Sequence, residues 1–216
     1  MNIQTFWNKL ADIFFPEADR CPFCNAEGGF CEKCREALQN QRIEDHAAVF
    51  RYDGIVRDLI RRLKFSGQAH LASPMADLIE EAVDLLGDII TCVPLHPRRK
   101  RMRGYNQSAL IAKRLSELTG IPYAPLIVKT RNTPPQSLMK SRAERLANIR
   151  GAFRIKGTPD LTGKHILLTD DVFTTGATAE ECITLLKQAG AESVRVITFA
   201  KGGALWQPQE HCSEEH

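Results

Sequence analysis

The 216-residue sequence has no long hydrophobic run, no internal repeat and no low-complexity tract. No apolar stretch approaches the ~20 residues that a membrane-spanning helix needs. Lys9 and Asp12 interrupt the apolar residues near the N-terminus, so this end does not read as a secretory signal. The formal net charge is only +3, which by itself does not require a nucleic-acid partner. We therefore expect a cytoplasmic globular protein.

The composition is that of an ordinary folded protein, with 43% hydrophobic and 25% charged residues. The length suits one sizeable α/β domain and a small appendage. We expect an N-terminal module over residues 1–45, a main domain over residues 46–202 and a polar tail over residues 203–216. Within the first module, residues 3–14 place apolar side chains at helical spacing, and we expect them to pack on the body of the protein. The alternative is a helix on a membrane surface, which the near absence of Lys and Arg disfavours.

Four of the seven cysteines form the pattern Cys-x2-Cys-x6-Cys-x2-Cys. Two residues between the members of a pair let a tight turn aim both sulfurs at one tetrahedral ion. The alternatives are four free thiols or a redox pair, but a reducing compartment and two close pairs favour Zn²⁺. The predicted site has no open coordination position, so the zinc is structural or part of a binding surface. Its ligands are Cys21, Cys24, Cys31 and Cys34.

The most informative stretch is residues 166–178, Ile-Leu-Leu-Thr-Asp-Asp-Val-Phe-Thr-Thr-Gly-Ala-Thr. It predicts a strand, an acidic pair (Asp170 and Asp171), a Thr/Gly loop and then a helix over residues 179–188. A loop that opens a helix offers N–H groups and hydroxyls to a phosphate, and the aspartates can accept hydrogen bonds from sugar hydroxyls or hold a metal-bound water. The alternative is a tight turn with two solvated aspartates. The pattern favours a sugar phosphate.

Two further segments are strongly basic. In the predicted helix 55–65, apolar residues form one stripe and four basic residues lie on the other side. The basic side is either a solvated face or a lid over an anion. Five of the six residues 98–103 are basic, in a predicted loop that follows a buried strand over residues 88–93. Such a loop at the carboxyl end of a parallel strand suits a pyrophosphate. Further predicted elements are helices over 72–86 and 105–118, strands over 124–128, 153–155 and 193–199, and a long polar segment over 129–150.

Residues 166–178 resemble the phosphoribosyl pyrophosphate (PRPP) loop of type I phosphoribosyltransferases. The resemblance implies an α/β fold with a mainly parallel sheet flanked by helices, and Mg²⁺ that enters with PRPP. It also implies that Asp170 and Asp171 bind the ribose hydroxyls. The resemblance further implies that the 5′-phosphate is bound by Thr174, Thr175, Gly176, Ala177 and Thr178. For the pyrophosphate it implies the peptide at Leu95 and His96 and arginines that spacing does not fix, with Arg98 and Arg103 as candidates.

The whole motif order narrows the resemblance further. The four-cysteine module precedes Tyr52-Asp-Gly, Val93-Pro-Leu, Arg103-Gly-Tyr-Asn-Gln, Gln136-Ser-Leu and the PRPP loop. This set is similar to the ComF family of bacterial competence-associated, phosphoribosyltransferase-like proteins, over residues 1–200. The resemblance implies that the zinc module serves as the hood that covers the acceptor and that the segment 129–150 is a mobile lid.

Three functions follow from the resemblance. The first is pentosyl transfer from PRPP to an acceptor in nucleotide or nucleobase metabolism. The second is support of natural transformation by action on incoming single-stranded DNA in the cytoplasm, with other DNA-uptake proteins and a second copy of the chain as further expected partners. The third is a PRPP or nucleotide sensor without turnover. For DNA, the sequence offers basic residues on segments 57–62, 98–103 and 142–150, and Phe23 and Phe30 as candidate base-stacking residues.

Overall fold

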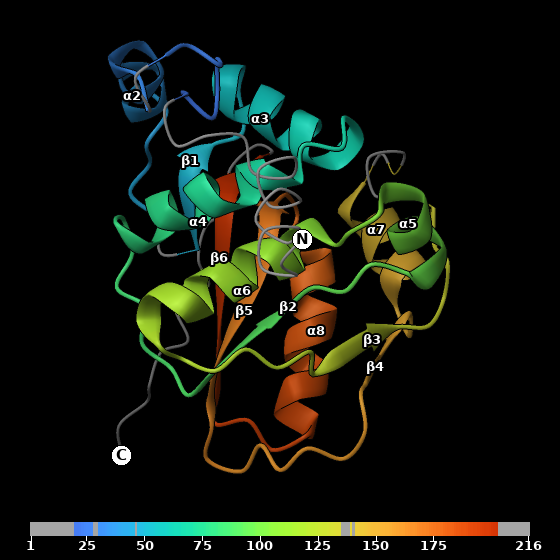
Figure 1. Cartoon of the computed structure of the whole chain (residues 1–216). Helices are drawn as coiled ribbons and strands as arrows, with labels where there is room; N and C mark the ends of the chain where they lie inside the picture. Colours follow the sequence, from blue (N-terminus) through green and yellow to red (C-terminus); the bar gives the residue numbers. More distant parts are fainter. Residues whose placement is uncertain (1–19, 28–29, 46, 135–138, 140, 203–216) are drawn as a thin grey trace, which may run out of the picture.

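The computed structural model describes most of the chain (Figure 1). The described residues are 20–27, 30–45, 47–134, 139 and 141–202. The helix expected over residues 3–14 and the tail expected over residues 203–216 lie outside them. Among the described residues, no helix combines the length and the apolar character needed to cross a membrane.

A four-stranded parallel sheet forms the centre of the molecule, in the order β1-β6-β5-β2. Its strands are β1 (Ala48–Arg51), β2 (Ile89–Cys92), β5 (His165–Phe173) and β6 (Ser193–Lys201). Every pairing between them is parallel. Strand β5 is therefore paired on both sides, and the carboxyl ends of all four strands meet at one edge. The expected mainly parallel sheet is confirmed.

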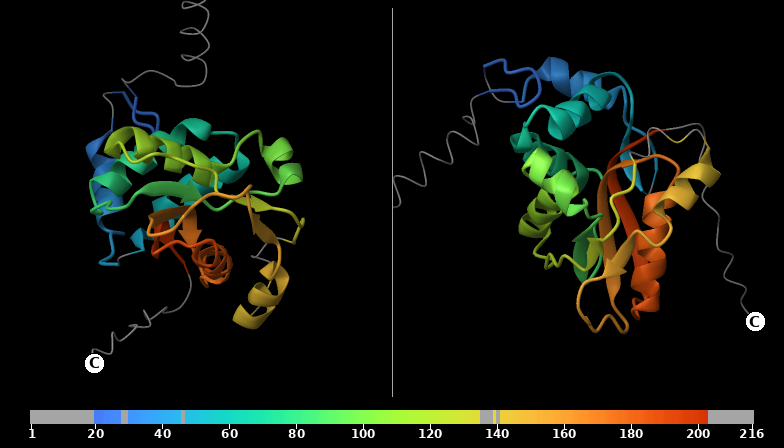
Figure 2. Two further views of the ribbon diagram at one scale, coloured as in Figure 1. Left: turned by 90° about the horizontal axis from the view of Figure 1, so that it is seen from below. Right: turned by 90° about the vertical axis from the view of Figure 1, so that its right-hand side faces the viewer.

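Helices cover both faces of this sheet (Figure 2). One face carries α3 (Gly54–Phe65), the short η1 (Ala69–Leu71), α4 (Ala72–Glu80) and α6 (Gln107–Thr119). The other carries α8 (Ala177–Gln188) and, beside it, α7 (Arg142–Ile149). The apolar core is divided accordingly. Met75, Ile111 and Leu167 belong to the cluster under α3, α4 and α6, whereas Leu168 and Leu186 belong to the cluster under α8.

Three smaller parts complete the fold. Helix α2 (Glu32–Gln39) begins within the second cysteine pair, directly after Cys31, and α5 (Pro97–Arg103) follows strand β2. Strands β3 (Ile127–Lys129) and β4 (Phe153–Ile155) form a separate antiparallel pair. In Figure 1 this pair lies below α5 and α7, to one side of the central sheet.

Several boundaries differ from the sequence prediction. The segment expected to be a loop over residues 98–103 is helix α5, because Pro97 occupies its first turn and fixes a helical φ without losing a hydrogen bond. The strand expected over 124–128 is displaced to β3, and the helix expected to reach residue 86 ends at Glu80. Strand β5 runs to Phe173, so Asp170 and Asp171 lie within the strand rather than after it.

Candidate functional site

The acidic pair sits near the carboxyl end of the central strand β5, and the chain then turns directly into α8. Gly176 makes this turn possible. Its φ is +79°, and a Cβ at this position would lie 2.9 Å from the Phe173 ring, which is closer than real Cβ contacts. A glycine is therefore required for both backbone conformation and space. The first N–H groups of α8 lie next to the hydroxyls of the threonines in the loop 174–178, which is the arrangement that binds anions at helix N-termini.

A small cavity opens at this loop. It is lined by residues at the end of β5, by the loop itself and by Val196 and Thr198 of β6. Thr198 is the register partner of Asp170, and its hydroxyl donates to the carbonyls of Ala47 (2.8 Å) and Ala200 (3.3 Å). The five predicted phosphate-binding residues, Thr174 to Thr178, all line the cavity together with Asp170.

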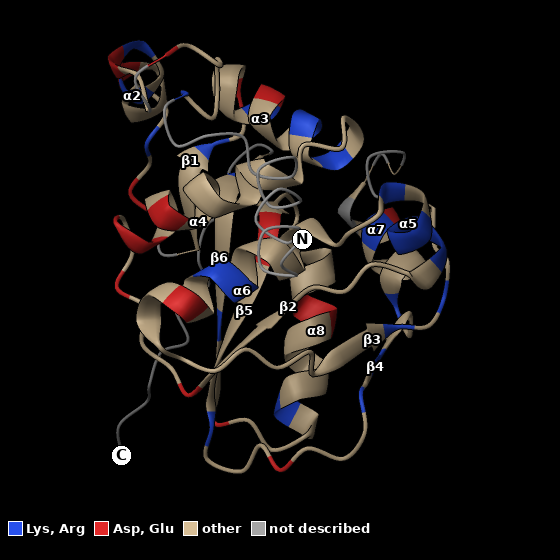
Figure 3. Cartoon of the chain, viewed as in Figure 1, with Lys and Arg blue, Asp and Glu red and all other residues tan. Residues whose placement is uncertain are grey.

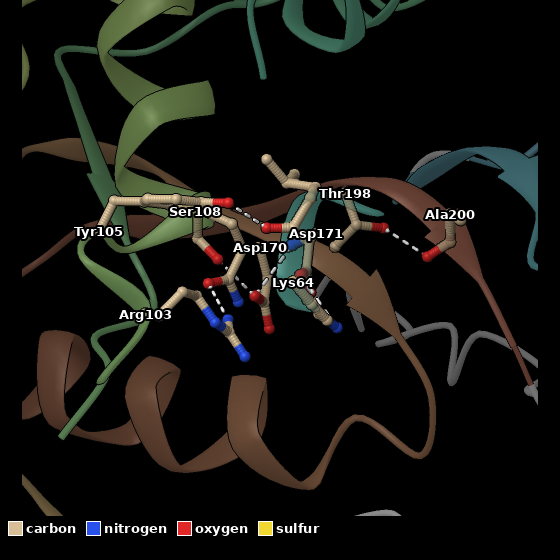
Figure 4. Close-up of polar contacts among 10 residues, drawn as sticks. Lys64, Arg103, Tyr105, Ser108, Asp170, Asp171, Thr198 and Ala200 are labelled. Atoms are coloured by element: carbon tan, nitrogen blue, oxygen red, sulfur yellow. Dashed lines mark hydrogen bonds and ion pairs between the residues drawn. The ribbon is translucent and has the colours of Figure 1, made fainter. Parts of the chain in front are cut away.

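Asp171 is the more buried of the two acids, and it is paired with a lysine from a distant part of the chain. The Lys64 Nζ on α3 lies 2.9 Å from the Asp171 Oδ2 (Figure 4). The Asp171 side chain is 4% exposed and that of Lys64 is 22% exposed. Burial by itself lowers the pKa of Lys64, but the carboxylate of Asp171 outweighs it and raises the pKa above its usual value. Lys64 is therefore a cation fixed in the site.

Asp170 has a different environment. Its Oδ1 accepts hydrogen bonds from the Ser108 hydroxyl on α6 (2.7 Å) and from the Asp171 backbone N–H (2.9 Å). Burial and the negative charge of Asp171 raise the pKa of Asp170 to about 7, although Lys64 and Ser108 oppose the shift. The two neighbouring acids thus have different roles: one is held by a fixed cation, and the other changes its charge near neutral pH.

The basic segment after β2, residues 95–106 with helix α5, lies beside the acidic pair, and we call it the α5 corner. Leu95 and His96 precede α5, and the His96 Nδ1 accepts the Arg98 N–H at 3.3 Å. Arg98 is exposed, whereas Arg103 is half-buried and its guanidinium donates to the Gln107 side chain. In the close-up, Arg103 points toward the region of Asp170. Of the two candidate arginines, Arg103 is thus the one that the fold brings next to the acids.

This corner is fastened to α3. The Tyr105 hydroxyl, between α5 and α6, donates to the Leu63 carbonyl at 2.6 Å. Arg103 also lies over the ring of Phe65, with 5.5 Å between the guanidinium carbon and the ring centroid. The last turn of α3 therefore contributes Lys64 to the site and holds the corner that carries Arg103.

A second lysine, Lys129 on β3, is near enough to Asp170 for their charges to interact. The Lys129 Nζ lies 5.0 Å from the centroid of the Phe153 ring, and burial together with the charge of Arg99 lowers the pKa of Lys129 to about 8. Arg99 itself donates to the Thr133 carbonyl at 2.5 Å and so ties α5 to the start of the polar segment. At the other end of that segment, Arg131 donates to the carbonyls of Asn148 (3.0 Å) and Arg150 (2.7 Å).

Sequence reasoning missed three side chains at this site. Lys64 was counted only among the basic residues of the predicted helix 55–65, and Ser108 and Lys129 were given no role. Each comes from a different element and contacts or faces acids that are far away in sequence. No local signal distinguishes Lys64 from the neighbouring Arg61 and Arg62 of the same helix, because only the fold brings it to Asp171.

The four cysteines come together as predicted. Their sulfur atoms all lie within 4.8 Å of one another, and the Cys24 and Cys31 sulfurs are 3.5 Å apart. A tetrahedral Zn²⁺ with Zn–S distances of about 2.3 Å would place its sulfurs roughly 3.8 Å apart, so the cluster fits such an ion. Within the described part of the chain, no other group of three or more His, Cys, Asp or Glu side chains has this geometry.

The proposed stacking role of the module's aromatic residues is wrong for Phe23. Its side chain is buried with 4% exposure and packs edge-to-face on Phe30, with ring centroids 5.0 Å apart. Arg35 covers the Phe30 ring at 4.8 Å. The Phe23 carbonyl accepts a hydrogen bond from Arg62 on α3. These aromatic side chains join the cysteine module to the main domain, and Phe23 cannot stack on a base.

The comparisons with known proteins agree with this geometry. A family model described as "Phosphoribosyl transferase domain" matches residues 102–215. Competence protein ComFC of Streptococcus pneumoniae is 30% identical over 186 residues, which cover 85% of this chain and 81% of that protein. DNA utilization protein YhgH of Escherichia coli is 33% identical over 190 residues, covering 82% and 81%.

Among solved structures, a purine phosphoribosyltransferase from Pyrococcus horikoshii aligns with a TM-score of 0.36 at 23% identity. The alignment covers 64% of this chain and 76% of that one. The sequence matches extend over most of the chain, and the matched domain contains the acidic pair and its threonine loop. The chain therefore belongs to the ComF family, phosphoribosyltransferase-like proteins with the type I phosphoribosyltransferase fold.

Proposed function

We propose that this protein binds PRPP at the carboxyl end of β5 and supports natural transformation by acting on incoming single-stranded DNA in the cytoplasm. One observation carries the PRPP part. Asp170 and Asp171 stand two residues before a threonine loop whose Gly176 turns the chain into the N-terminus of α8. The Asp170 carboxylate, which suits a diol, and the loop, whose N–H groups suit a phosphate, therefore line one cavity.

Each group of the ligand has a proposed partner. The ribose hydroxyls donate to Asp170 and Asp171, and the 5′-phosphate lies in the loop 174–178. The pyrophosphate faces the peptide at Leu95 and His96. Arg103 supplies positive charge there, because it is the arginine of the α5 corner that lies beside the acids. The exposed Arg98 reaches the same anion only from the rim.

Metal ions have separate proposed places. The four cysteines hold a structural Zn²⁺, in accord with their thiolate chemistry and mutual distances. Mg²⁺ enters with PRPP and uses oxygens of the ribose and the pyrophosphate. Asp171 is a poor direct ligand for it, since its carboxylate already pairs with Lys64 at 2.9 Å. The chemistry that Mg²⁺ supplies is neutralisation of the pyrophosphate charge.

The DNA part rests on the relatives and on charge. The named relatives are competence and DNA utilization proteins. Helices α3 and α5 together carry nine of the chain's basic residues, marked blue in Figure 3. A phosphate backbone is the ligand class that uses many such cations at once.

Calorimetry with PRPP and Mg²⁺ tests the PRPP part. We expect the wild-type protein to bind and the double substitution Asp170→Asn with Asp171→Asn to abolish the heat signal, because amides cannot accept from the ribose hydroxyls as charged acceptors do. Asp84→Asn is the matched control, an exposed aspartate in the turn before β2, at the opposite edge of the sheet. Equal affinity in the double variant and the wild-type protein would refute the proposal.

A second measurement separates the two remaining functions. Pyrophosphate release is followed with PRPP, Mg²⁺ and a panel of nucleobases or an oligonucleotide as acceptor. Release that depends on one acceptor assigns pentosyl transfer. Binding without release, in a protein whose calorimetry is normal, assigns a PRPP sensor.

A further inference from the structure

One aromatic side chain at the edge of the site remains uncovered. Phe65, the last residue of α3, is 74% exposed and belongs to neither apolar cluster of the core. A single exposed aromatic side chain has no functional meaning by itself, so the groups around the ring decide what it can bind. Its only described partner is Arg103, whose guanidinium lies 5.5 Å from the ring centroid. The exposure leaves the rest of the ring open.

The position of the ring ties it to the proposed PRPP cavity. Phe65 follows Lys64, which is paired with Asp171. The hydrogen bond from the Tyr105 hydroxyl to the Leu63 carbonyl fixes this turn of α3 against the α5–α6 corner. Phe65 therefore lies at the edge of the site, next in sequence to the lysine that pairs with Asp171 and in contact with Arg103. Figure 4 shows Lys64 and Arg103 beside the acidic pair.

Apart from Asp170 and Asp171 of the site itself, the two segments that meet at the ring carry only positive charge. Neither the segment 59–76 nor the segment 89–116, which meet at Phe65 and Arg103, contains an Asp or Glu. The same segments carry ten Lys and Arg residues, of which Arg61, Arg98, Lys100 and Arg101 are exposed around this corner. Next to Arg103, the Met102 side chain is 81% exposed. Blue segments of α3 and α5 mark this surface in Figure 3.

We propose that Phe65, backed by Arg103, is a stacking platform for a nucleobase of single-stranded nucleic acid whose phosphates lie along the exposed cations of α3 and α5. This inference rests on the DNA part of the proposed function and gives it a location. A nucleobase stacks on a phenylalanine ring irrespective of its identity, and the flanking cations select a chain of phosphates. A free nucleobase would use the ring but not those cations, and duplex DNA keeps its bases stacked on one another. Single-stranded nucleic acid uses both features.

The test compares two labelled single-stranded oligomers of equal length, oligo-dT and an abasic strand with the same number of phosphates, by fluorescence anisotropy. We expect wild-type protein to bind the dT strand more tightly. Phe65→Ala should weaken dT binding by about 5- to 100-fold, the effect of losing one stacked base, and should leave the abasic strand unaffected. Phe65→Trp should retain the preference. Arg101→Gln should weaken both strands equally and lower the salt dependence.

Leu86→Ala is the control, because Leu86 is similarly exposed (70%) but precedes β2 at the far edge of the sheet. The inference is overturned if Phe65→Ala binds dT like the wild type, if the wild type does not distinguish dT from the abasic strand, or if Phe65→Ala changes the oligomeric state instead. Calorimetry with PRPP runs in parallel. Normal PRPP binding by a protein that binds neither strand would refute the platform and the DNA part, and would leave the PRPP part intact.

Discussion

Replacing Lys64 with methionine should destabilise the protein far more than a surface substitution does. The change keeps an unbranched side chain of similar length and removes only the charge that faces Asp171. At 2.9 Å and an effective dielectric constant of about 20, the attraction between the two charges is about 6 kcal/mol, of which desolvation offsets part. Breaking buried pairs typically costs about 3–5 kcal/mol. We expect a loss near the lower end at pH 7.5, since Lys64 is 22% exposed.

Proton uptake by Asp171 sets the upper limit of the stability that Lys64→Met can lose. A carboxylate left without its cation can take up a proton, which for an ordinary aspartic acid side chain at pH 7.5 costs about 5 kcal/mol and at pH 5 only about 1.5 kcal/mol. The destabilisation caused by Lys64→Met should therefore shrink between pH 7.5 and pH 5. The double substitution Lys64→Met with Asp171→Asn should recover most of the lost stability, because it removes both charges.

Urea unfolding followed by circular dichroism measures these differences. At pH 7.5 the midpoint of Lys64→Met should fall by about 1–2 M relative to the wild type. Lys113→Met, which removes an exposed lysine of α6, is the control and should unfold like the wild type. A change of less than about 1 kcal/mol for Lys64→Met, or a double variant no more stable than the single one, would show that the pair does not hold Asp171 in place.

Two further predictions concern pH and metal. Because the pKa of Asp170 in the folded protein is raised to about 7, Asp170 carries a proton at pH 6 that must leave before the carboxylate can accept the ribose hydroxyls. PRPP affinity measured by calorimetry should therefore rise about tenfold from pH 6 to pH 8, and Asp170→Asn should remove that rise. The same raised pKa favours folding below the unfolded value near 3.9, and this contribution is lost as pH rises through 7. Metal analysis should find one zinc ion per chain. The zinc should be absent after Cys24→Ser but retained after Cys182→Ala, because the Cys182 thiol is buried away from the cluster. Wild-type protein without metal would contradict the zinc assignment.

The local parts of this structure follow from sequence patterns. The strand, the acidic pair and the threonine loop are contiguous in the sequence. Gly176 predicts the turn into α8, where a φ of +79° favours glycine. The cysteine spacing likewise encodes a cluster within a few turns of chain. Both predictions rely on neighbours in sequence, and short-range geometry is what single sequences specify best.

The long-range parts do not follow. Lys64 and Asp171 are 107 positions apart, and only the packing of α3 over the end of β5 brings them to 2.9 Å. Phe23 and Phe65 are both aromatic residues near basic ones, yet Phe23 is 4% exposed and Phe65 is 74% exposed. Nothing in the local sequence separates the two, because burial depends on which elements pack around the ring. Base stacking was therefore predicted for a residue in the core.

The hydrogen bond from Arg62 to the Phe23 carbonyl joins the cysteine module to the helix that carries Lys64. Phe23 stands between Cys21 and Cys24 of the cysteine cluster, and Arg62 lies two residues before Lys64, the partner of Asp171. These two contacts and the half turn of helix between Arg62 and Lys64 form a path along which the order of the cysteine module can be coupled to the acidic pair. Coupling of this kind is reciprocal: if metal binding tightens the hold on a ribose, then a bound ribose must tighten the hold on the metal by the same factor.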